Sequence, residues 1–165
     1  MATAPLIGFV LGSDSDLPQM ERAEKFLNDF DVPYEIRILS AHRTPHEAVE
    51  YATGAKARGL KVIAGMAGMA AHLAGVLAAH ADVPVLGIPA QGGALNGLDA
   101  LLSTVQMPGG VPVATFAIGK SGALNAAIFA CQMMAMSDDV MAAKVAKYKV
   151  DQTVAVLKKD AAQNS

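Results

Sequence analysis

The sequence lacks most of the features that would assign a chain to a class at once. Cys131 is the only cysteine among 165 residues, so no disulfide can form within the chain, and no cysteine–histidine group has zinc-site spacing. Cys131 lies in an apolar run and is expected to be a small core residue rather than a reactive thiol. The net charge of −2 leaves no basic surplus for nucleic acid or an anionic membrane. Residues 1–5 have no basic stretch before the first apolar run, so we expect no signal peptide and a cytoplasmic location.

Charge is also scarce in the middle of the chain. Between Val62 and Ser137 the only charged residues are Asp82, Asp99 and Lys120. A chain of this size buries only about two-thirds of its surface by folding alone, so such a stretch needs further cover. Residues 62–81 could span a bilayer in length, but their glycines, histidines and many alanines make a membrane helix the weaker interpretation. We therefore predict a homo-oligomer that buries this region, with no membrane and no nucleic-acid partner.

Short apolar runs alternate with helical patterns along the chain. Five runs predict strands, at residues 6–11, 34–39, 60–65, 84–88 and 113–117. Helical patterns follow them at about 18–27, 45–58, 70–80, 98–105 and 123–135, and a long amphipathic C-terminal helix covers about 138–159. This alternation predicts an α/β fold, a three-layer α/β/α sandwich around a parallel sheet. We expect the flavodoxin-like strand order 2-1-3-4-5, in a single domain over residues 1–165 with its core at about 6–152.

The most informative stretch is Ser40-Ala41-His42-Arg43-Thr44-Pro45, where the second strand passes into a helix. Thr44 is a good N-cap, and Pro45 suits the first helical position because its missing N–H would be unpaired there anyway. Arg43 can grip a phosphate or carboxylate with two hydrogen bonds, and His42 can exchange a proton at neutral pH. On these six residues alone, a histidine packed at the sheet edge beside a solvated arginine is an equally good interpretation.

The loop after the first strand, residues 12–16, is a second candidate. Its sequence Gly-Ser-Asp-Ser-Asp precedes a helix, so it can offer N–H groups to a phosphate or the Asp16 carboxylate to ribose hydroxyls. It fits neither the Walker loop nor the Gly-x-Gly-x-x-Gly dinucleotide pattern, and plain N-capping is by itself the better explanation. Loops that follow parallel strands meet at one sheet edge. The five loops therefore predict one polar pocket that shares Ser13, Asp16, Ser40, His42, Arg43, His72, Gln91 and Lys120.

Together these motifs resemble one known family, the class I 5-(carboxyamino)imidazole ribonucleotide mutases of purine biosynthesis. The resemblance runs from about residue 6 to about residue 152 and rests on motifs at residues 12–16, 40–45, 70–73, 84–89, 105–113 and 117–119. It implies the three-layer fold, assembled as an octamer. It also implies an enzyme without cofactors or a metal site, because the electron-rich ring needs no metal, biotin or ATP. A functional coupling to the ATP-dependent synthetase that makes the substrate follows from the same resemblance.

The resemblance further implies a reaction on a small ribonucleotide substrate. The family moves a carboxylate from the exocyclic nitrogen to the neighbouring ring carbon, through release and recapture of CO2, which gives 4-carboxy-5-aminoimidazole ribonucleotide. His42 would be the catalytic general acid and base. The substrate-binding residues would be Ser13, Ser15, Asp16, Ser40, Arg43, Gly68 and His72. Among them, Asp16 is expected on the ribose and Arg43, with Ser15 and Ser40, on the phosphate, while a core histidine is the commoner outcome for His72 considered alone.

The sequence departs from the family pattern at three positions. Met66, Met69 and Ala74 stand where the family usually has glycine, glycine and proline. A methionine would be strained at either position if the glycine that it replaces needs a positive φ. Two alternatives stay open: a carboxylase that adds free CO2 to the unmodified ribonucleotide, and a non-catalytic flavodoxin-like module that holds a flavin or nucleotide. Direct carboxylases usually have lysine after the loop histidine, so Arg43 favours the mutase.

Overall fold

The structure is a computed structural model that describes residues 4–164 of the chain. It divides into two compact units, Met1–Ala127 and Ile128–Ser165. The first unit contains the whole sheet, and the second contains the end of one helix and the last helix. That residues 1–165 act as one domain stays a prediction. Within residues 4–164, no helix combines the length and the apolar composition that crossing a bilayer requires.

A five-stranded sheet forms the centre of the first unit. Its strands are β1 (Ile7–Leu11), β2 (Tyr34–Ile38), β3 (Val62–Ala67), β4 (Val85–Pro89) and β5 (Ala114–Thr115). They lie in the order β2-β1-β3-β4-β5, and every neighbouring pair is parallel. The predicted flavodoxin-like order is therefore confirmed. Because all five strands run in one direction, the loops that follow them emerge at a single edge of the sheet.

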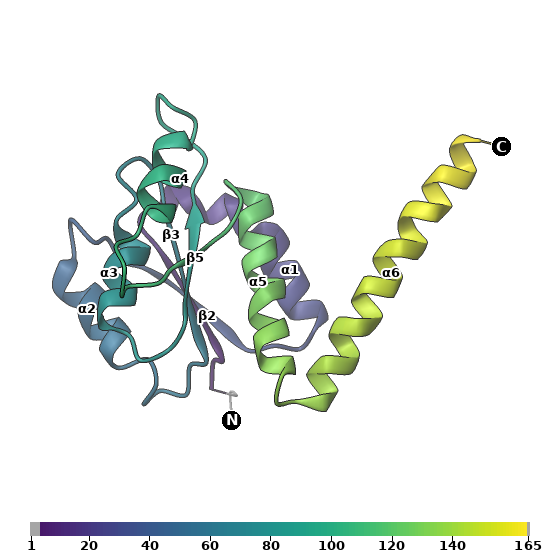
Figure 1. The fold of residues 1–165 in the computed structure, drawn as a ribbon, viewed down its shortest axis with the longest axis horizontal. Coiled ribbons are helices and arrows are strands. Elements are labelled where there is room, and N and C mark those ends of the chain that lie inside the picture. Colours follow the sequence, from purple (N-terminus) through teal and green to yellow (C-terminus); the bar gives the residue numbers. More distant parts are fainter. Residues whose placement is uncertain (1–3, 165) are drawn as a thin grey trace. The chain divides into compact units, whose positions relative to one another are not determined.

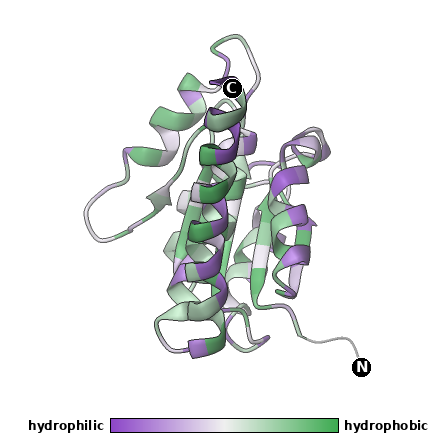
Figure 2. Cartoon of the chain, turned by 90° about the vertical axis from the view of Figure 1, so that its right-hand side faces the viewer, coloured by the Kyte–Doolittle hydropathy of each residue, from purple (hydrophilic) through white to green (hydrophobic). Residues whose placement is uncertain are grey.

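Helices cover both faces of this sheet. They are η1 (Asp14–Gln19, a 3₁₀ helix), α1 (Glu21–Asp29), α2 (Pro45–Thr53), α3 (Leu73–His80), α4 (Leu98–Val105) and α5 (Lys120–Ala135). In Figure 1, α2 and α3 lie on one side of the sheet and α1 on the other, which gives the predicted three layers. Accordingly β1 and β4 are buried along their whole length, as strands covered on both faces must be, and the sheet is mostly hydrophobic (Figure 2).

A polar brace at the edge of the core fixes α2 against the sheet. The Tyr51 hydroxyl donates to a carboxylate oxygen of Glu35 at 2.8 Å, and Arg58 donates to the same oxygen at 2.7 Å. Gly8 on β1 makes room for this arrangement, since a Cβ there would lie 2.1 Å from the Tyr51 hydroxyl oxygen. Because α2 directly follows the loop of residues 40–44, this packing also sets where that loop stands.

The first predicted helix starts later than expected. Residues 14–19 form η1 instead of a helix from Pro18, and α1 begins only at Glu21. The Ser13 hydroxyl caps η1 by accepting the N–H of Ser15 at 3.3 Å. The next helix, α2, ends at Thr53 rather than at about residue 58, and residues 54–59 form turns.

The helix after β3 also starts later than the prediction of residue 70. Residues 70–72 lie outside the helix, where the N–H of Ala71 donates to the hydroxyl of Ser103 on α4 at 3.3 Å and the N–H of His72 donates to the carbonyl of Ala70 at 2.8 Å. As a result α3 begins at Leu73, and His72 is its N-cap residue rather than a residue one turn inside.

The second unit is helical. Its last helix, α6 (Asp139–Gln163), has 25 residues and starts where the Asp138 carboxylate accepts the N–H of Met141 at 3.0 Å. The helix ends beyond the predicted residue 159, and hydrophobic and hydrophilic residues are mixed along it (Figure 2). Cys131 is buried, and burial raises the pKa of its thiol to about 12. The thiol is therefore protonated at neutral pH, which agrees with the prediction of a core residue.

Candidate active site

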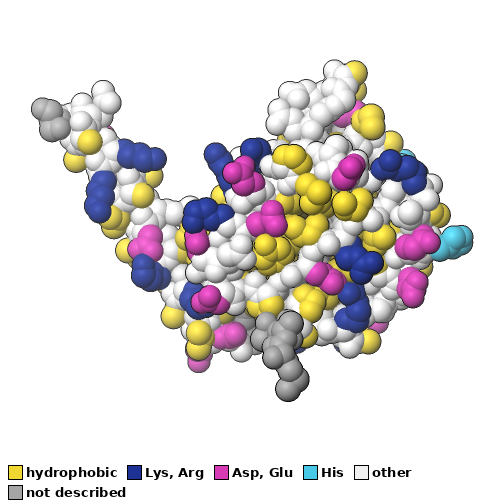
Figure 3. All heavy atoms as spheres, turned by 180° about the vertical axis from the view of Figure 1, so that it is seen from behind, with side chains coloured by type: hydrophobic (Ala, Val, Ile, Leu, Met, Phe, Trp, Pro, Cys, Tyr) yellow, Lys and Arg dark blue, Asp and Glu magenta, His cyan; other side chains and the backbone are white. Residues whose placement is uncertain are grey.

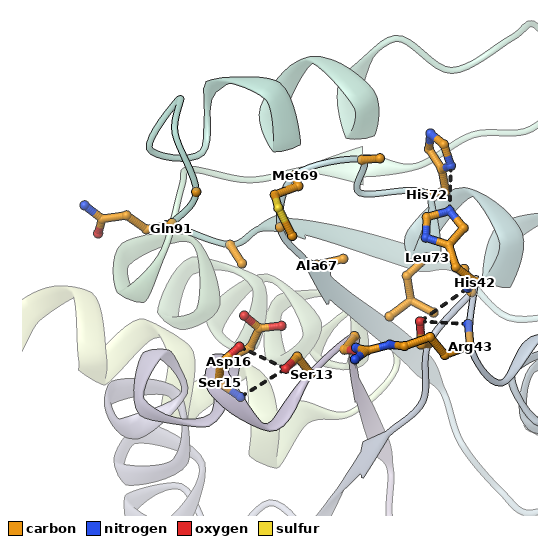
Figure 4. A pocket seen from close by; sticks show the side chains of 18 residues that line it. Ser13, Ser15, Asp16, His42, Arg43, Ala67, Met69, His72, Leu73 and Gln91 are labelled. Atoms are coloured by element: carbon orange, nitrogen blue, oxygen red, sulfur yellow. Dashed lines mark hydrogen bonds between the residues drawn. The ribbon is translucent and has the colours of Figure 1, made fainter.

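A cavity of about 390 Å³ opens where the loops after β1, β2, β3 and β4 meet (Figure 4). Its lining falls within residues 12–16, 40–43, 67–73 and 90–93, all in the first unit. We call residues 12–16 and 40–43 the polar half of the pocket, and residues 67–70 and 90–93 the apolar half. The cavity thus lies at the edge of the sheet where the sequence predicts a site.

The loop of residues 40–44 is folded by its own hydroxyl groups. The Ser40 hydroxyl oxygen accepts the N–H groups of His42 at 3.3 Å and Arg43 at 3.2 Å. Thr44 occupies the predicted N-cap position of α2, but its hydroxyl accepts the N–H of Ser40 at 2.8 Å instead of capping the helix. Pro45 is the first helical residue, as predicted. These bonds present the side chains of His42 and Arg43 to the cavity.

Arg43 connects the two loops of the polar half. Its guanidinium donates to the carbonyl oxygen of Gly12 at 2.6 Å, and the side chain extends toward Ser13 (Figure 4). A guanidinium has five N–H donors, so this single bond leaves most of its donors for an anion in the cavity. The arrangement suits a phosphate or carboxylate ligand.

The two histidines of the pocket form a direct pair. Nε2 of His42 lies 2.9 Å from Nδ1 of His72, and the two rings meet edge to face (Figure 4). A hydrogen bond between imidazoles needs one nitrogen to donate and the other to accept, so the two facing nitrogens hold one proton between them. Each ring keeps a second nitrogen that the pair does not use. The pair can therefore exchange a proton with a ligand, and His72 is an exposed partner of His42 rather than a core histidine.

Ser13, Ser15 and Asp16 form the floor of the polar half. The Ser15 hydroxyl donates to the Ser13 oxygen at 2.9 Å, and the Ser13 hydroxyl donates to Asp14 at 3.1 Å. Asp16 is only 7% exposed, and its carboxylate points into the cavity (Figure 4). Burial raises the pKa of this carboxyl above its usual range, while a backbone hydrogen bond from Ser13 and the nearby Arg43 act against the shift. A carboxylate has several acceptor sites, so this one can also accept from ribose hydroxyls.

The apolar half consists largely of residues without bulky side chains. Ala67, Gly68, Ala70 and Ala90 line the cavity there, while the Gln91 side chain points away from it (Figure 4). An added Cβ on Gly68 would fit without a clash, because it would make an ordinary contact with Ala90 at 3.7 Å. This part of the pocket can therefore hold a small apolar molecule.

The two methionines that depart from the family pattern differ in backbone conformation. Met66 is a fully buried residue of β3, and its φ is not positive. Met69 has a φ of +53°, a conformation that costs a residue with a side chain about 1–2 kcal/mol. The anticipated strain is therefore present at Met69 only. Ala74 lies buried on α3.

The structure places every predicted catalytic and substrate-binding residue in the cavity lining, but not every residue of the predicted loop cluster. Lys120 lies outside the cavity lining and pairs with Glu21 at 3.3 Å. Conversely, the sequence did not indicate Gln19, whose side chain supports the loop after β4. Its amide exchanges two hydrogen bonds with the backbone of Gln91, at 2.9 and 3.2 Å. Ser103 is another such residue, because nothing in α4 signals that its hydroxyl holds the loop at Ala71. Among residues 4–164, no cluster of three acidic, histidine or cysteine side chains could hold a metal ion.

Comparison with known proteins identifies the family of the chain. Residues 6–155 match the AIR carboxylase family. The chain belongs to this family. Among its relatives, the N5-carboxyaminoimidazole ribonucleotide mutase of Vibrio vulnificus is 51% identical over 151 residues, 92% of this chain and 94% of the relative. The protein of the same name from Bacillus subtilis is 52% identical over 141 residues, 86% of this chain and 87% of the relative.

Solved structures in the AIR carboxylase family agree with the fold. The crystal structure of Treponema denticola PurE matches with a TM-score of 0.85 at 26% identity, over 95% of this chain and 97% of that one. The family predicted from the sequence motifs is therefore confirmed, together with the parallel sheet and its strand order.

Proposed function

We propose that the chain catalyses the mutase step of purine biosynthesis, which converts N5-carboxyaminoimidazole ribonucleotide into its ring-carboxylated isomer. The observation that carries this proposal is the His42–His72 pair, 2.9 Å apart, in one cavity with Arg43 and a wall of small residues. The reaction needs a proton carrier, a grip on an anion and space for CO2, and the cavity has a candidate for each. The names of relatives about half identical in sequence support the same reaction.

The polar half is suited to the nucleotide part of the substrate. We assign the phosphate to Arg43, with the hydroxyls of Ser15 and Ser40, because a guanidinium and hydroxyl protons are natural phosphate ligands. Asp16 would accept from the ribose hydroxyls, which would satisfy its buried carboxylate. Ser13 would complete the floor beneath the sugar.

His42 is the proposed general acid and base. The bond between the exocyclic nitrogen and the carboxylate breaks with its electron pair left on nitrogen, and the imidazolium of His42 supplies the proton that nitrogen takes. The electron-rich ring carbon then attacks the released CO2 and forms the new carbon–carbon bond. His42 finally removes the proton from that carbon, so it ends in the state in which it began. His72 would steady the His42 ring and contact the carboxylate, and Gly68 would lie beside the CO2.

An assay of purified protein tests the proposed reaction. The protein is given N5-carboxyaminoimidazole ribonucleotide without ATP, biotin or added metal, and the ring-carboxylated product is measured. A parallel reaction contains the unmodified aminoimidazole ribonucleotide with bicarbonate. We expect rapid conversion of the carboxyamino substrate and slow conversion in the parallel reaction. The opposite preference would assign a direct carboxylase, while visible absorbance of the purified protein without turnover would indicate a flavin-binding module.

The protein is further proposed to act as a homo-oligomer, an octamer by resemblance to the family. Exposed apolar residues recur on one face of α4, at Leu98, Leu102 and Val105, and with the same spacing on α6, at Val150, Val154 and Leu157. Hydrophobic side chains also reach the surface over much of the face seen in Figure 3. Apolar residues that gather on one exposed face of a helix are suited to contact with another subunit. Light scattering at micromolar concentration should report the assembly, and a stable monomer would contradict it.

Two further expectations belong to this function. Functional coupling to the ATP-dependent synthetase that makes the substrate is expected by resemblance to the family. A cytoplasmic location would fit a step of nucleotide synthesis.

A further inference from the structure

Met69 is the one strained residue in the lining of the pocket that has a side chain. Its φ of +53° places it in the left-handed region, and its side chain is 63% exposed. Strain of this kind persists only where the surroundings fix the backbone, and it concentrates at functional sites. A large apolar side chain is thus held at the mouth of a cavity without being buried there.

A hydrogen bond to α4 holds the loop just after Met69. The Ser103 hydroxyl oxygen accepts the N–H of Ala71 at 3.3 Å. Its own proton has two carbonyl acceptors within reach, that of Asp99 and, farther away at 3.2 Å, that of Met69. Since the Asp99 oxygen is the nearer, the tie from Ser103 to this loop runs through Ala71, two residues after Met69.

The Met69 side chain crosses from the loop after β3 to the loop after β4. A Cβ built on Gly93 would lie 3.1 Å from Cγ of Met69 and 3.8 Å from its sulfur. Figure 4 shows the side chain between Ala67 and the Gln91 loop, facing the floor that carries Asp16 and Ser13. The thioether thus spans the apolar half, above the small residues of that wall.

We propose that Met69 is an apolar cover for the reacting end of the substrate, which keeps released CO2 in the pocket until the ring carbon captures it. A ligand held by Arg43 and Asp16 would place its ring beneath the thioether and bury the exposed methionine surface. Methionine suits this task because its unbranched chain adapts to the shape of what it covers. This inference rests on the proposed mutase reaction, and the experiment below separates the failure of one from the failure of the other.

The test follows an isotopic label in the carboxylate of the substrate, in a buffer that contains unlabelled bicarbonate. Wild-type protein should deliver most of the label to the product. Met69→Ala should release more of it as CO2, and the ratio of released to transferred label should rise by about five- to twenty-five-fold, the factor expected for about two-thirds of a methionine's burial. Met69→Leu, which keeps an apolar side chain, should restore most of the retention.

Two further variants test whether the Met69 side chain acts by covering the pocket or through the strain of its backbone. Met69→Gly removes the cover and relieves the backbone strain, so it should leak label as Met69→Ala does while melting at a higher temperature. Asp31→Gly relieves another left-handed residue, φ +53°, outside the pocket, and should leave label retention unchanged.

The possible outcomes decide separately on the covering role of Met69 and on the mutase reaction. Equal retention in wild type, Met69→Ala and Met69→Gly, with normal oligomer size, would overturn the cover. A loss of retention only together with a loss of the oligomer would assign Met69 to a subunit contact and overturn it as well. If wild-type protein forms no ring-carboxylated product at all, the proposed mutase reaction itself fails.

Discussion

The two halves of the pocket differ in how they are built. The polar half is held by hydrogen bonds among its own residues, as between Arg43 and Gly12, and it presents charged groups. The apolar half presents few polar groups and is held from outside, by Ser103 on α4 and by Gln19 on η1. The difference indicates a division of labour. In the proposed reaction, one half would recognise the nucleotide through specific contacts, and the other would contribute a small, apolar space in which CO2 can stay.

His42 belongs to the polar half and pairs with His72, and its loss should have the largest effect. His42→Asn keeps similar bulk and hydrogen-bonding capacity but cannot carry a proton near neutral pH. Turnover should fall by about a hundredfold or more, while nucleotide affinity and oligomer size stay near those of wild type. His46→Asn, an exposed change on α2 outside the cavity, is the matched control. A His42→Asn protein that binds nucleotide and turns over at the wild-type rate would end the case for this residue.

Disruption of the polar half should weaken binding more than chemistry. Arg43→Ala should lower nucleotide affinity by about ten- to a hundredfold, since a hydrogen bond to a charged group contributes about 1.5–3 kcal/mol. Titration calorimetry with a ribonucleotide measures this directly, with Arg22→Ala as the control for a lost exposed charge outside the cavity. Unchanged affinity in Arg43→Ala would remove this residue from the phosphate site.

Disruption of the apolar half should slow turnover more than it weakens binding. Gly68→Ala adds one methyl group without a backbone clash, because its Cβ would meet only Ala90, at 3.7 Å. Turnover should fall by about tenfold, the smaller effect expected for one carbon in a fitted pocket, while affinity and melting temperature hold. Gly109→Ala is the control, since an added Cβ there meets nothing within 4 Å. If both variants turn over alike, the space beside Gly68 does not hold a reacting group.

The smallest predicted effect is on stability. Burial raises the pKa of Asp16, so the folded state disfavours the ionised carboxylate. Protonated Asp16 contributes fully to the stability of the folded state below the pKa that the residue has in the unfolded chain. This contribution is lost as the pH rises through the higher pKa that it has in the folded protein. Asp16→Asn should therefore raise the urea concentration at the unfolding midpoint at pH 7 and change it less near pH 4, while it weakens nucleotide binding. A variant that is less stable at pH 7 would show that the carboxylate supports the fold.

The sequence predicted the polar half better than the apolar half. Alternating apolar runs and helical patterns were sufficient for the sheet and its order, and the motif around His42 identified the loop, its first helical residue and the family. The pairing of His42 with His72 was beyond reach, because it depends on where α3 begins. Just before that start, the N–H of Ala71 donates to the hydroxyl of Ser103, 32 residues later in the chain. Long-range contacts of this kind leave no local pattern, so the support of the apolar half could be found only in the structure.

The conformation of Met69 illustrates the same limit. The sequence could say that a methionine replaces a glycine, but whether the backbone there has a positive φ is a property of the folded loop. Met66 and Met69 are equivalent as departures from the family pattern, yet only Met69 is left-handed.

A crystal structure of the protein with a bound aminoimidazole ribonucleotide tests the division of the pocket most directly. The account predicts the phosphate against Arg43, the ribose hydroxyls on Asp16, and the ring between the His42 imidazole and the small residues around Gly68. A phosphate in the apolar half, or a ring beyond hydrogen-bond reach of His42, would contradict it.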